Sequence, residues 1–479
     1  MYRKKACFVC GVCMSWLRDK FDGFFGAVAH DERKKVLLLG ISFCLVIGAY
    51  TIVRELKDIV FTSIVGIDRG YISYAKILSM LILIPTLFIH SNLVDRLVRH
   101  HLVYVYTIFY GVVGLICVYL LGSPIIGLAN TDSSPYRIFG WLFYFFIEGY
   151  NPLVISVFWA FTNSITGPKS ATNNYTAIIV GSKIGGIIAA GSAWLFLRSC
   201  HFSDVFNHQL LLLIGSLVLL IVPLLIYRLI TTVPSSSLHG YEPAYRVEKK
   251  RTVAHEHSSF FSSITEGITL LFKYPYVMGL FGVSFCFDLV STALKIENLI
   301  FVRTTACTMS GSTAFLCWQA MLAHMVGLVI VLFGTRAIIS FLGERRALML
   351  VPLLTGIAVV VFLVTPSYVT AVIAFVVIRA VNYALAVPLR ESLYIPTIKE
   401  IQFKTKPWID GIGSKFAKTC SSTFNMYVNG FRGTFLLLAQ TSFFGVITAV
   451  WFVTAYLLGR RFEKALKNNE VIGLEKKPL

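Results

Sequence analysis

Residues 209–230 read QLLLLIGSLVLLIVPLLIYRLI, an almost unbroken run of apolar side chains. About 20 consecutive apolar residues cross the roughly 30 Å of hydrocarbon in a bilayer as one helix. Eleven more stretches of similar length and character occur along the chain. They cover residues 36–54, 71–92, 102–122, 138–163 and 175–197 before this run, and 276–296, 312–335, 346–365, 368–388, 412–432 and 434–458 after it. The sequence therefore predicts an all-α integral membrane protein with twelve transmembrane helices.

The composition supports a membrane protein. Of the 479 residues, 56% are hydrophobic and 14% are charged, whereas soluble domains carry about 45–50% apolar and about 25% charged residues. The formal net charge is +19, and in a soluble protein a basic face is typical of nucleic-acid binding. Here the basic residues fall mainly between apolar stretches, where they orient helices in the bilayer. We expect lipid around the protein and no nucleic-acid partner.

The longest polar stretch between predicted helices divides the chain into two halves. Residues 231–275 contain Pro234, Pro243 and the basic cluster Lys249-Lys250-Arg251. Two six-helix halves joined by a basic loop are typical of major-facilitator-type transporters, which bind substrate near the membrane midplane. The predicted domains are a basic tail (1–35), a first six-helix bundle (36–230), the linker (231–275), a second bundle (276–458) and a tail (459–479).

The distribution of Lys and Arg predicts the orientation. The N-terminal tail carries Arg3, Lys4 and Lys5, and the even-numbered loops and the C-terminal tail are also rich in basic residues. The odd-numbered loops carry about one or two each. Cytoplasmic loops are enriched in Lys and Arg. Both termini are therefore predicted to lie in the cytoplasm.

No sequence motif supports an enzyme or a metal protein. The chain has no phosphate-binding Gly-x4-Gly-Lys-Ser/Thr loop, no His-Glu-x-x-His zinc pattern and no nucleophile elbow. Cys7, Cys10 and Cys13 have a spacing that metal sites use, but they lack a fourth ligand nearby and lie in a tail predicted to face a reducing compartment. We expect no cofactor and no metal.

Several charged residues lie near or within the apolar stretches, where each costs at least about 2.5–3.5 kcal/mol at the bilayer centre. They are Lys57, Lys76, Glu148, Lys183, Asp288, Lys295, Glu297, Arg379, Arg390, Lys415 and Lys418. Positive charges outnumber negative ones by eight to three in this set. Structural ion pairs alone would balance the signs, because an unpaired buried charge is strongly destabilising. The surplus indicates an anionic solute, and phosphate suits both Lys and Arg.

Some of these charges also have a purely structural interpretation. Lys57 lies at the predicted end of the first helix and Lys76 one turn into the second, where lysines reach the interface without any further function. Lys183 lies among glycines that favour close helix packing. Asp288 and Lys295 are seven apart and share a helix face, where either is able to pair with another helix.

Two further segments favour a polar cavity. Glu148 precedes Pro152, and a proline within a membrane helix frees carbonyls that only a cavity or neighbouring protein satisfies. The stretch 412–432 carries Lys415, Lys418 and Asn425, and is too polar to face lipid. It either lines a cavity or does not cross the membrane.

Several motifs resemble one transporter family. They are Leu56-Lys57-Asp58, Lys76 with Pro85, Glu148 followed by Phe158-Trp159-Ala-Phe161-Thr-Asn163, Tyr394-Ile-Pro396, Lys404-Thr-Lys406-Pro-Trp-Ile-Asp410 and Gly413-Ser-Lys415-Phe-Ala-Lys418. In this order they are similar to the nucleotide transporters (ATP:ADP antiporters) of plastids and obligate intracellular bacteria. The resemblance extends over most of the chain. It departs at the seventh helix, where the family has an acid and this chain has Ser291.

The resemblance implies a nucleotide carrier, working by ATP/ADP exchange or proton-coupled import, in the cytoplasmic membrane of an intracellular bacterium. The implied substrate-binding residues, together with those found from charge, are Lys57, Lys76, Glu148, Asn163, Lys183, Lys295, Arg379, Lys415 and Lys418. Glu148 and Asp288 are the candidates for proton coupling, and a monomer is expected. The loss of the acid at Ser291 leaves the coupling mode and the nucleotide open. A carrier of another anionic or non-nucleotide solute is the alternative.

Overall fold

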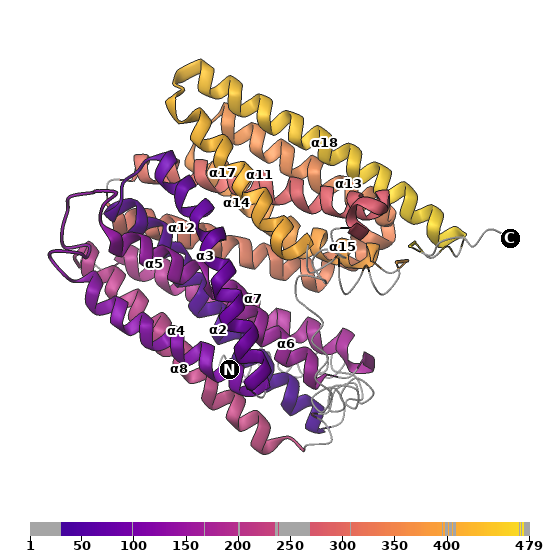
Figure 1. The fold of residues 1–479 in the computed structure, drawn as a ribbon, viewed down its shortest axis with the longest axis horizontal. Coiled ribbons are helices and arrows are strands. Elements are labelled where there is room, and N and C mark those ends of the chain that lie inside the picture. Colours follow the sequence, from indigo (N-terminus) through magenta and orange to yellow (C-terminus); the bar gives the residue numbers. More distant parts are fainter. Residues whose placement is uncertain are drawn as a thin grey trace, which may run out of the picture.

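The structure is a computed structural model of the whole chain. It describes residues 30–97, 99–166, 168–199, 202–234, 238, 269–306, 308–394, 396–397, 401, 405, 409–468, 470 and 472–473. The described residues form two groups of long helices, coloured indigo to magenta and orange to yellow in Figure 1, that pack side by side. Residues 1–29 of the N-terminal tail, which include the Cys7-Cys10-Cys13 run, and most of the predicted linker lie outside the described residues.

The first group contains seven α-helices and one short π-helical segment in the described part. They are α2 (His30–Ile64), α3 (Arg69–Arg96), α4 (Arg99–Leu121), α5 (Ile138–Glu148), η1 (Asn151–Ile155), α6 (Ser156–Ile165), α7 (Pro168–Ser199) and α8 (Asp204–Thr232). The second group is α11 (Pro275–Thr305), α12 (Met309–Val329), η3 (Ile330–Gly334), α13 (Thr335–Val364), α14 (Tyr368–Val381), η4 (Asn382–Ala386), α15 (Val387–Leu393), η6 (Ile409–Gly413), α17 (Ser414–Tyr427), η7 (Val428–Gly430) and α18 (Gly433–Lys467).

Each predicted transmembrane stretch falls on one of these helices or on a consecutive set of them. Within the described residues, nine helices are long and apolar enough to cross a membrane, which makes the chain a multi-pass membrane protein. The other three predicted spans correspond to α3, to α14–η4–α15 and to α17. The count of twelve crossings therefore stays a prediction.

The first long helix differs from its predicted boundary. The sequence suggested an end near residue 54, but α2 continues to Ile64 because the apolar residues Ile59, Val60 and Phe61 follow the charged run. Lys57 is therefore inside the helix, with only 3% of its surface exposed. The interpretation of Lys57 as a lysine at a helix end is wrong.

The helix that carries Glu148 is interrupted where the sequence places Pro152. A π-helical segment, η1, separates α5 from α6 there. Such segments are rare and are frequent at functional sites. The expected irregularity at Pro152 is confirmed, and it follows Glu148 directly.

The two halves are joined at one end of the molecule and have separate cores at the other. One hydrophobic cluster contains Leu56 and Phe143 of the first half together with Ile296 and Leu316 of the second. Towards the opposite end each half packs on its own, in one cluster that includes Phe43 and another that includes Trp451. The shared hydrophobic cluster lies where α2 and α11 end, and burial of its apolar surface holds the two halves together there. This end of the molecule is the closed end.

Polar contacts reinforce this closed end. The guanidinium of Arg69 donates two hydrogen bonds to the carboxylate of Glu297, at 3.0 and 2.7 Å. The carboxylate of Asp204 accepts from the backbone N–H groups of Met309 and Ser310, both at 3.1 Å. Charge-assisted bonds of this kind are stronger than neutral ones. They tie α3 to α11 and α8 to the start of α12.

Candidate functional site

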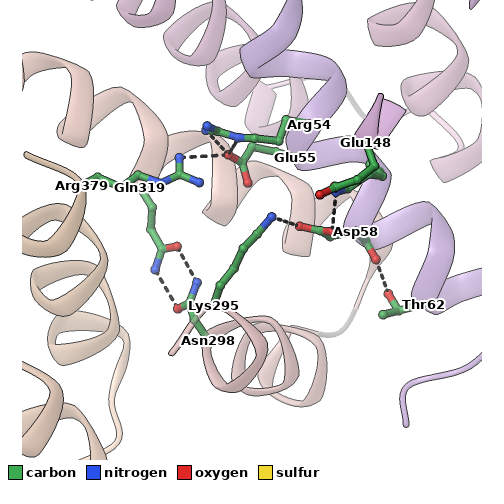
Figure 2. Close-up of polar contacts among 10 residues, drawn as sticks. Arg54, Glu55, Asp58, Thr62, Glu148, Lys295, Asn298, Gln319 and Arg379 are labelled. Carbon is green, nitrogen blue, oxygen red and sulfur yellow. Dashed lines mark hydrogen bonds and ion pairs between the residues drawn. The ribbon is translucent and has the colours of Figure 1, made fainter. Parts of the chain in front are cut away.

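The buried charges gather between the two halves, around the C-terminal third of α2 (Figure 2). Lys57 Nζ donates to Glu148 Oε2 at 2.5 Å. The same ammonium lies 4.3 Å from the centre of the Tyr144 ring, a cation–π distance. Glu148 is the last residue of α5, so the break before η1 places its carboxylate beside α2. Two residues 91 positions apart thus form one ion pair.

A second ion pair crosses between the halves. Lys295 of α11 approaches Asp58 of α2, with 2.6 Å between Nζ and Oδ2. Lys57 lies 3.6 Å from the other carboxylate oxygen of Asp58, so this acid contacts two lysines. Lys415 of α17 lies 3.7 Å from Glu148 Oε1. Four helices therefore contribute charges to one network, and two of them belong to the second half.

Two more lysines lie beside this network. Lys76 of α3 is within electrostatic range of Asp58, Lys295, Lys57 and Glu148. Among the described residues, neither Lys76 nor Lys418 of α17 has a carboxylate within 4.0 Å. An ammonium without an acidic partner in a membrane protein is costly. These two positions suit an anionic ligand.

Glu55 organises a neighbouring group of charges. Its carboxylate oxygen Oε1 accepts from the guanidinium of Arg54 at 2.5 Å and from that of Arg379 at 3.2 Å. Arg379 belongs to α14, so this contact also joins the two halves. Lys183 of α7 lies within electrostatic range of both arginines and is 7% exposed.

Positive charge exceeds negative charge in the whole region. The basic residues are Arg54, Lys57, Lys76, Lys183, Lys295, Arg379, Lys415 and Lys418, and the acidic residues among the described neighbours are Glu55, Asp58 and Glu148. Lys295 and Glu148 each keep 27% of their side-chain surface exposed. The region therefore offers surplus cations on a partly accessible surface between the halves, as binding of a polyanion requires.

The structure brings together most of the residues selected from sequence. Lys57, Lys76, Glu148, Lys183, Lys295, Arg379 and Lys415 lie in this region, and Lys418 is close to Lys415. Asp288 lies on α11, half-buried, and makes no ion pair with the described residues. Asn163 is in α6, but its side chain is outside the described part. Their predicted roles in substrate binding and proton coupling stay predictions.

Sequence reasoning missed three members of the site. Arg54, Glu55 and Asp58 surround Lys57 in the sequence and make the ion pairs described above. Asp58 is 3% exposed and Glu55 1% exposed. The sequence feature that could have revealed them is the apolar run after Asp58, because it extends the helix past these three residues and Lys57. Within the described residues there is no group of His, Cys, Asp and Glu able to hold a metal ion.

The fold has known counterparts among solved transporters. The structure of a D-xylose–proton symporter matches with a TM-score of 0.59 at 10% sequence identity, covering 90% of this chain and 97% of that one. A bacterial homologue of the human lysosomal transporter Spinster matches with a TM-score of 0.56 at 15% identity, covering 91% and 99%. The fold is that of major-facilitator-type transporters, which confirms the predicted fold class.

Sequence comparison is more specific. The chain is 23% identical to ADP,ATP carrier protein 1 of Chlamydia pneumoniae, over 94% of this chain and 96% of the relative. It is 21% identical to the protein of the same name from Chlamydia trachomatis, over 92% and 91%. The profile of the family described as TLC ATP/ADP transporter matches residues 136–462, more than half of the chain. The family is one of transporters, so the expectation that the chain is not an enzyme is confirmed. This chain belongs to the TLC ATP/ADP transporter family.

Proposed function

We propose that this protein is a secondary active transporter that carries nucleotides across a membrane by alternating access. The observation that carries the proposal is the surplus of cations around Lys57, held between the halves of a chain that belongs to an ATP/ADP transporter family. A nucleotide brings several phosphate charges, which the ammonium groups of Lys57, Lys76 and Lys295 would neutralise. Glu148 and Asp58 would hold these lysines when substrate is absent.

The ion pairs suggest how substrate binding is linked to movement of the halves. Lys295 and Lys415 belong to the second half, and each contacts an acid of the first. A phosphate group that takes over these lysines weakens the attraction between the halves, because each lysine then has a competing anionic partner. The halves would rock about the site, so that the closed end held by Arg69 and Glu297 opens in turn.

Proton coupling requires a carboxylate that gains and loses a proton during the transport cycle. Glu148 lies between Lys57 and Lys415, so its charge decides whether both lysines are neutralised without substrate. We propose Glu148 as the proton-coupling carboxylate and Asp288 as the second candidate. Where the family has an acid on α11, this chain has Ser291, and Lys295 of the same helix pairs instead with Asp58 of α2.

We further propose that the protein is a monomer in the cytoplasmic membrane of a bacterium, with both termini in the cytoplasm. Its predicted bundles are residues 36–230 and 276–458. The support is the Lys and Arg asymmetry of the loops and the bacterial source of the relatives. In this orientation the closed end lies on the outer side.

The decisive experiment is uptake of labelled nucleotides into liposomes that contain the purified protein. Uptake is measured with and without internal ADP, and with and without an imposed pH gradient. A requirement for internal nucleotide identifies an exchanger, and uptake driven by the pH gradient identifies a proton symporter. No nucleotide flux under any condition, with flux of another anion, would overturn the proposal.

A further inference from the structure

A second group of cations lies one helical turn from the lysine network. Glu55 and Asp58 are three residues apart on α2, so they share a helix face about 4.5 Å apart along the axis. Asp58 contacts lysines, whereas Glu55 contacts the two arginines Arg54 and Arg379 (Figure 2). Each acid also pairs with a cation of the opposite half. The two groups are therefore adjacent and differ in the chemistry of their cations.

The contacts of Glu55 concentrate two guanidinium groups at one point. Nε and Nη2 of Arg54 donate to Oε1 at 2.9 and 2.5 Å, and Nη1 of Arg379 donates to the same oxygen at 3.2 Å. An arginine has five N–H donors in a planar fork that fits the oxygens of a phosphate. Three of these donors, from both arginines, meet at one carboxylate oxygen. The arrangement therefore brings the guanidinium groups of Arg54 and Arg379 together.

Two further basic residues close around the arginines. Lys183 of α7 is within electrostatic range of Arg54 and Arg379, and so is His324 of α12. The ring of His324 lies 3.4 Å from Thr51 Oγ1, one turn before Arg54 on α2. The group thus draws on four helices, two from each half. Ligand sites in helical proteins lie between helices and combine a few polar groups that converge from different elements.

Lys295 connects the two groups. It is paired with Asp58, and it also lies within electrostatic range of Glu55 and Arg54. The proposed function assigns the nucleotide phosphates to the ammonium groups of Lys57, Lys76 and Lys295. An anion bound there is separated from the guanidinium forks by roughly one turn of α2, about 5 Å.

We propose that Arg54, Lys183 and Arg379 form a second anion subsite, whose ligand is a phosphate-class oxyanion, and that Glu55 competes with this ligand for the two guanidinium groups. The inference rests on the proposed function only for the identity of the transported molecule. Two sources supply the same chemistry: the far end of one polyphosphate chain, or a separate inorganic phosphate.

The test is equilibrium binding of labelled tripolyphosphate and labelled inorganic phosphate to the purified protein in detergent. Arg379→Gln removes one guanidinium group and should weaken tripolyphosphate binding about tenfold or more, because hydrogen bonds to charged groups are stronger than neutral ones. Glu55→Gln removes the competitor and should tighten binding. A variant that is merely destabilised does not bind more tightly, so the opposite directions separate a ligand site from a structural role.

Arg461→Gln is the matched control. Arg461 makes a two-pronged ion pair with Glu470 near the C-terminus, and its loss should leave anion binding unchanged. Should Arg379→Gln fail to fold, Lys183→Gln carries the same test. Binding in Arg379→Gln and Glu55→Gln equal to that of the unchanged protein, or weakened equally in both, would overturn the proposal.

The two sources give different binding patterns, and each supports the subsite. If one chain occupies both groups, tripolyphosphate and inorganic phosphate compete at a single equivalent. If the phosphate is separate, it binds to protein already saturated with a nucleoside monophosphate, and Arg379→Gln removes that second equivalent. Anion binding without any nucleotide uptake would refute the proposed function and keep the subsite. Nucleotide uptake by the unchanged protein, with anion binding that neither variant affects, would support the proposed function and refute the subsite.

Discussion

Lys295 of α11 and Asp58 of α2 form an ion pair at 2.6 Å that joins the two halves of the transporter. The residues are 237 positions apart, and Asp58 is 3% exposed whereas Lys295 keeps 27% of its side chain exposed. The pair therefore has one buried acid and one lysine that remains within reach of a ligand. An anion that attracts Lys295 competes directly with the contact that holds the halves together.

Removal of one partner of this pair should destabilise the protein more than removal of both. Asp58→Asn leaves Lys295 without its acid and should lower the free energy of unfolding by about 2 kcal/mol. The double variant Asp58→Asn/Lys295→Gln should recover at least part of this loss, because neither charge is left alone. Denaturant unfolding in detergent of the unchanged protein, Asp58→Asn, Lys295→Gln and the double variant measures the coupling energy between the two residues. Strictly additive effects would show that the ion pair contributes nothing to stability.

Lys57 is expected to be essential for transport and not for folding. Lys57→Gln removes the ammonium that contacts both Glu148 and Asp58, so phosphate loses its most buried partner. Nucleotide uptake into liposomes should fall to background, with the protein still eluting as a single species in size-exclusion chromatography. Lys464→Gln, in the last turn of α18, serves as the control lysine. Normal uptake by Lys57→Gln would remove Lys57 from the site.

Glu148 is expected to set the response to a pH gradient. Glu148→Gln keeps the shape of the side chain but removes its ionisable group, so Lys57 and Lys415 lose a titratable partner. Uptake by this variant should no longer rise when a pH gradient is imposed. Asp288→Asn is measured in parallel and should have a smaller effect, because Asp288 has no ion pair among the described residues. Loss of the response in Asp288→Asn alone would move the coupling residue to α11.

Close packing of α2 against α7 predicts a stability effect at Gly185. A Cβ atom there would clash with the carbonyl oxygen of Cys44, which is backbone and unable to move aside. Gly185→Ala should therefore cost about 1–3 kcal/mol of stability. Gly40→Ala, on the same pair of helices, adds a Cβ that meets nothing within 4 Å and should be tolerated. Thermal unfolding in detergent compares them, and equal midpoints would show that the helices separate at little cost.

Much of the candidate site could be predicted from single residues, because a charge inside an apolar stretch is informative by itself. Lys57, Glu148, Lys295 and Arg379 were found in this way. Asp58 was not, because it follows Lys57 directly beyond the predicted helix end at residue 54, and a neighbouring acid there is balanced by that lysine without a partner on another helix. The acid that pairs with Lys295 was also hidden, since it lies on a different helix.

The amino-acid sequence by itself determined the membrane class, the two-part layout and the surplus of positive charge, because these depend on composition and on the period and length of apolar runs. Only the tertiary structure decided which charges meet. It paired Lys57 with Glu148 and Lys295 with Asp58, and it separated the arginines around Glu55 from the lysines. The reason is physical. A helix fixes the face of each side chain, but the neighbour across that face comes from packing between segments hundreds of residues apart, which no local pattern encodes.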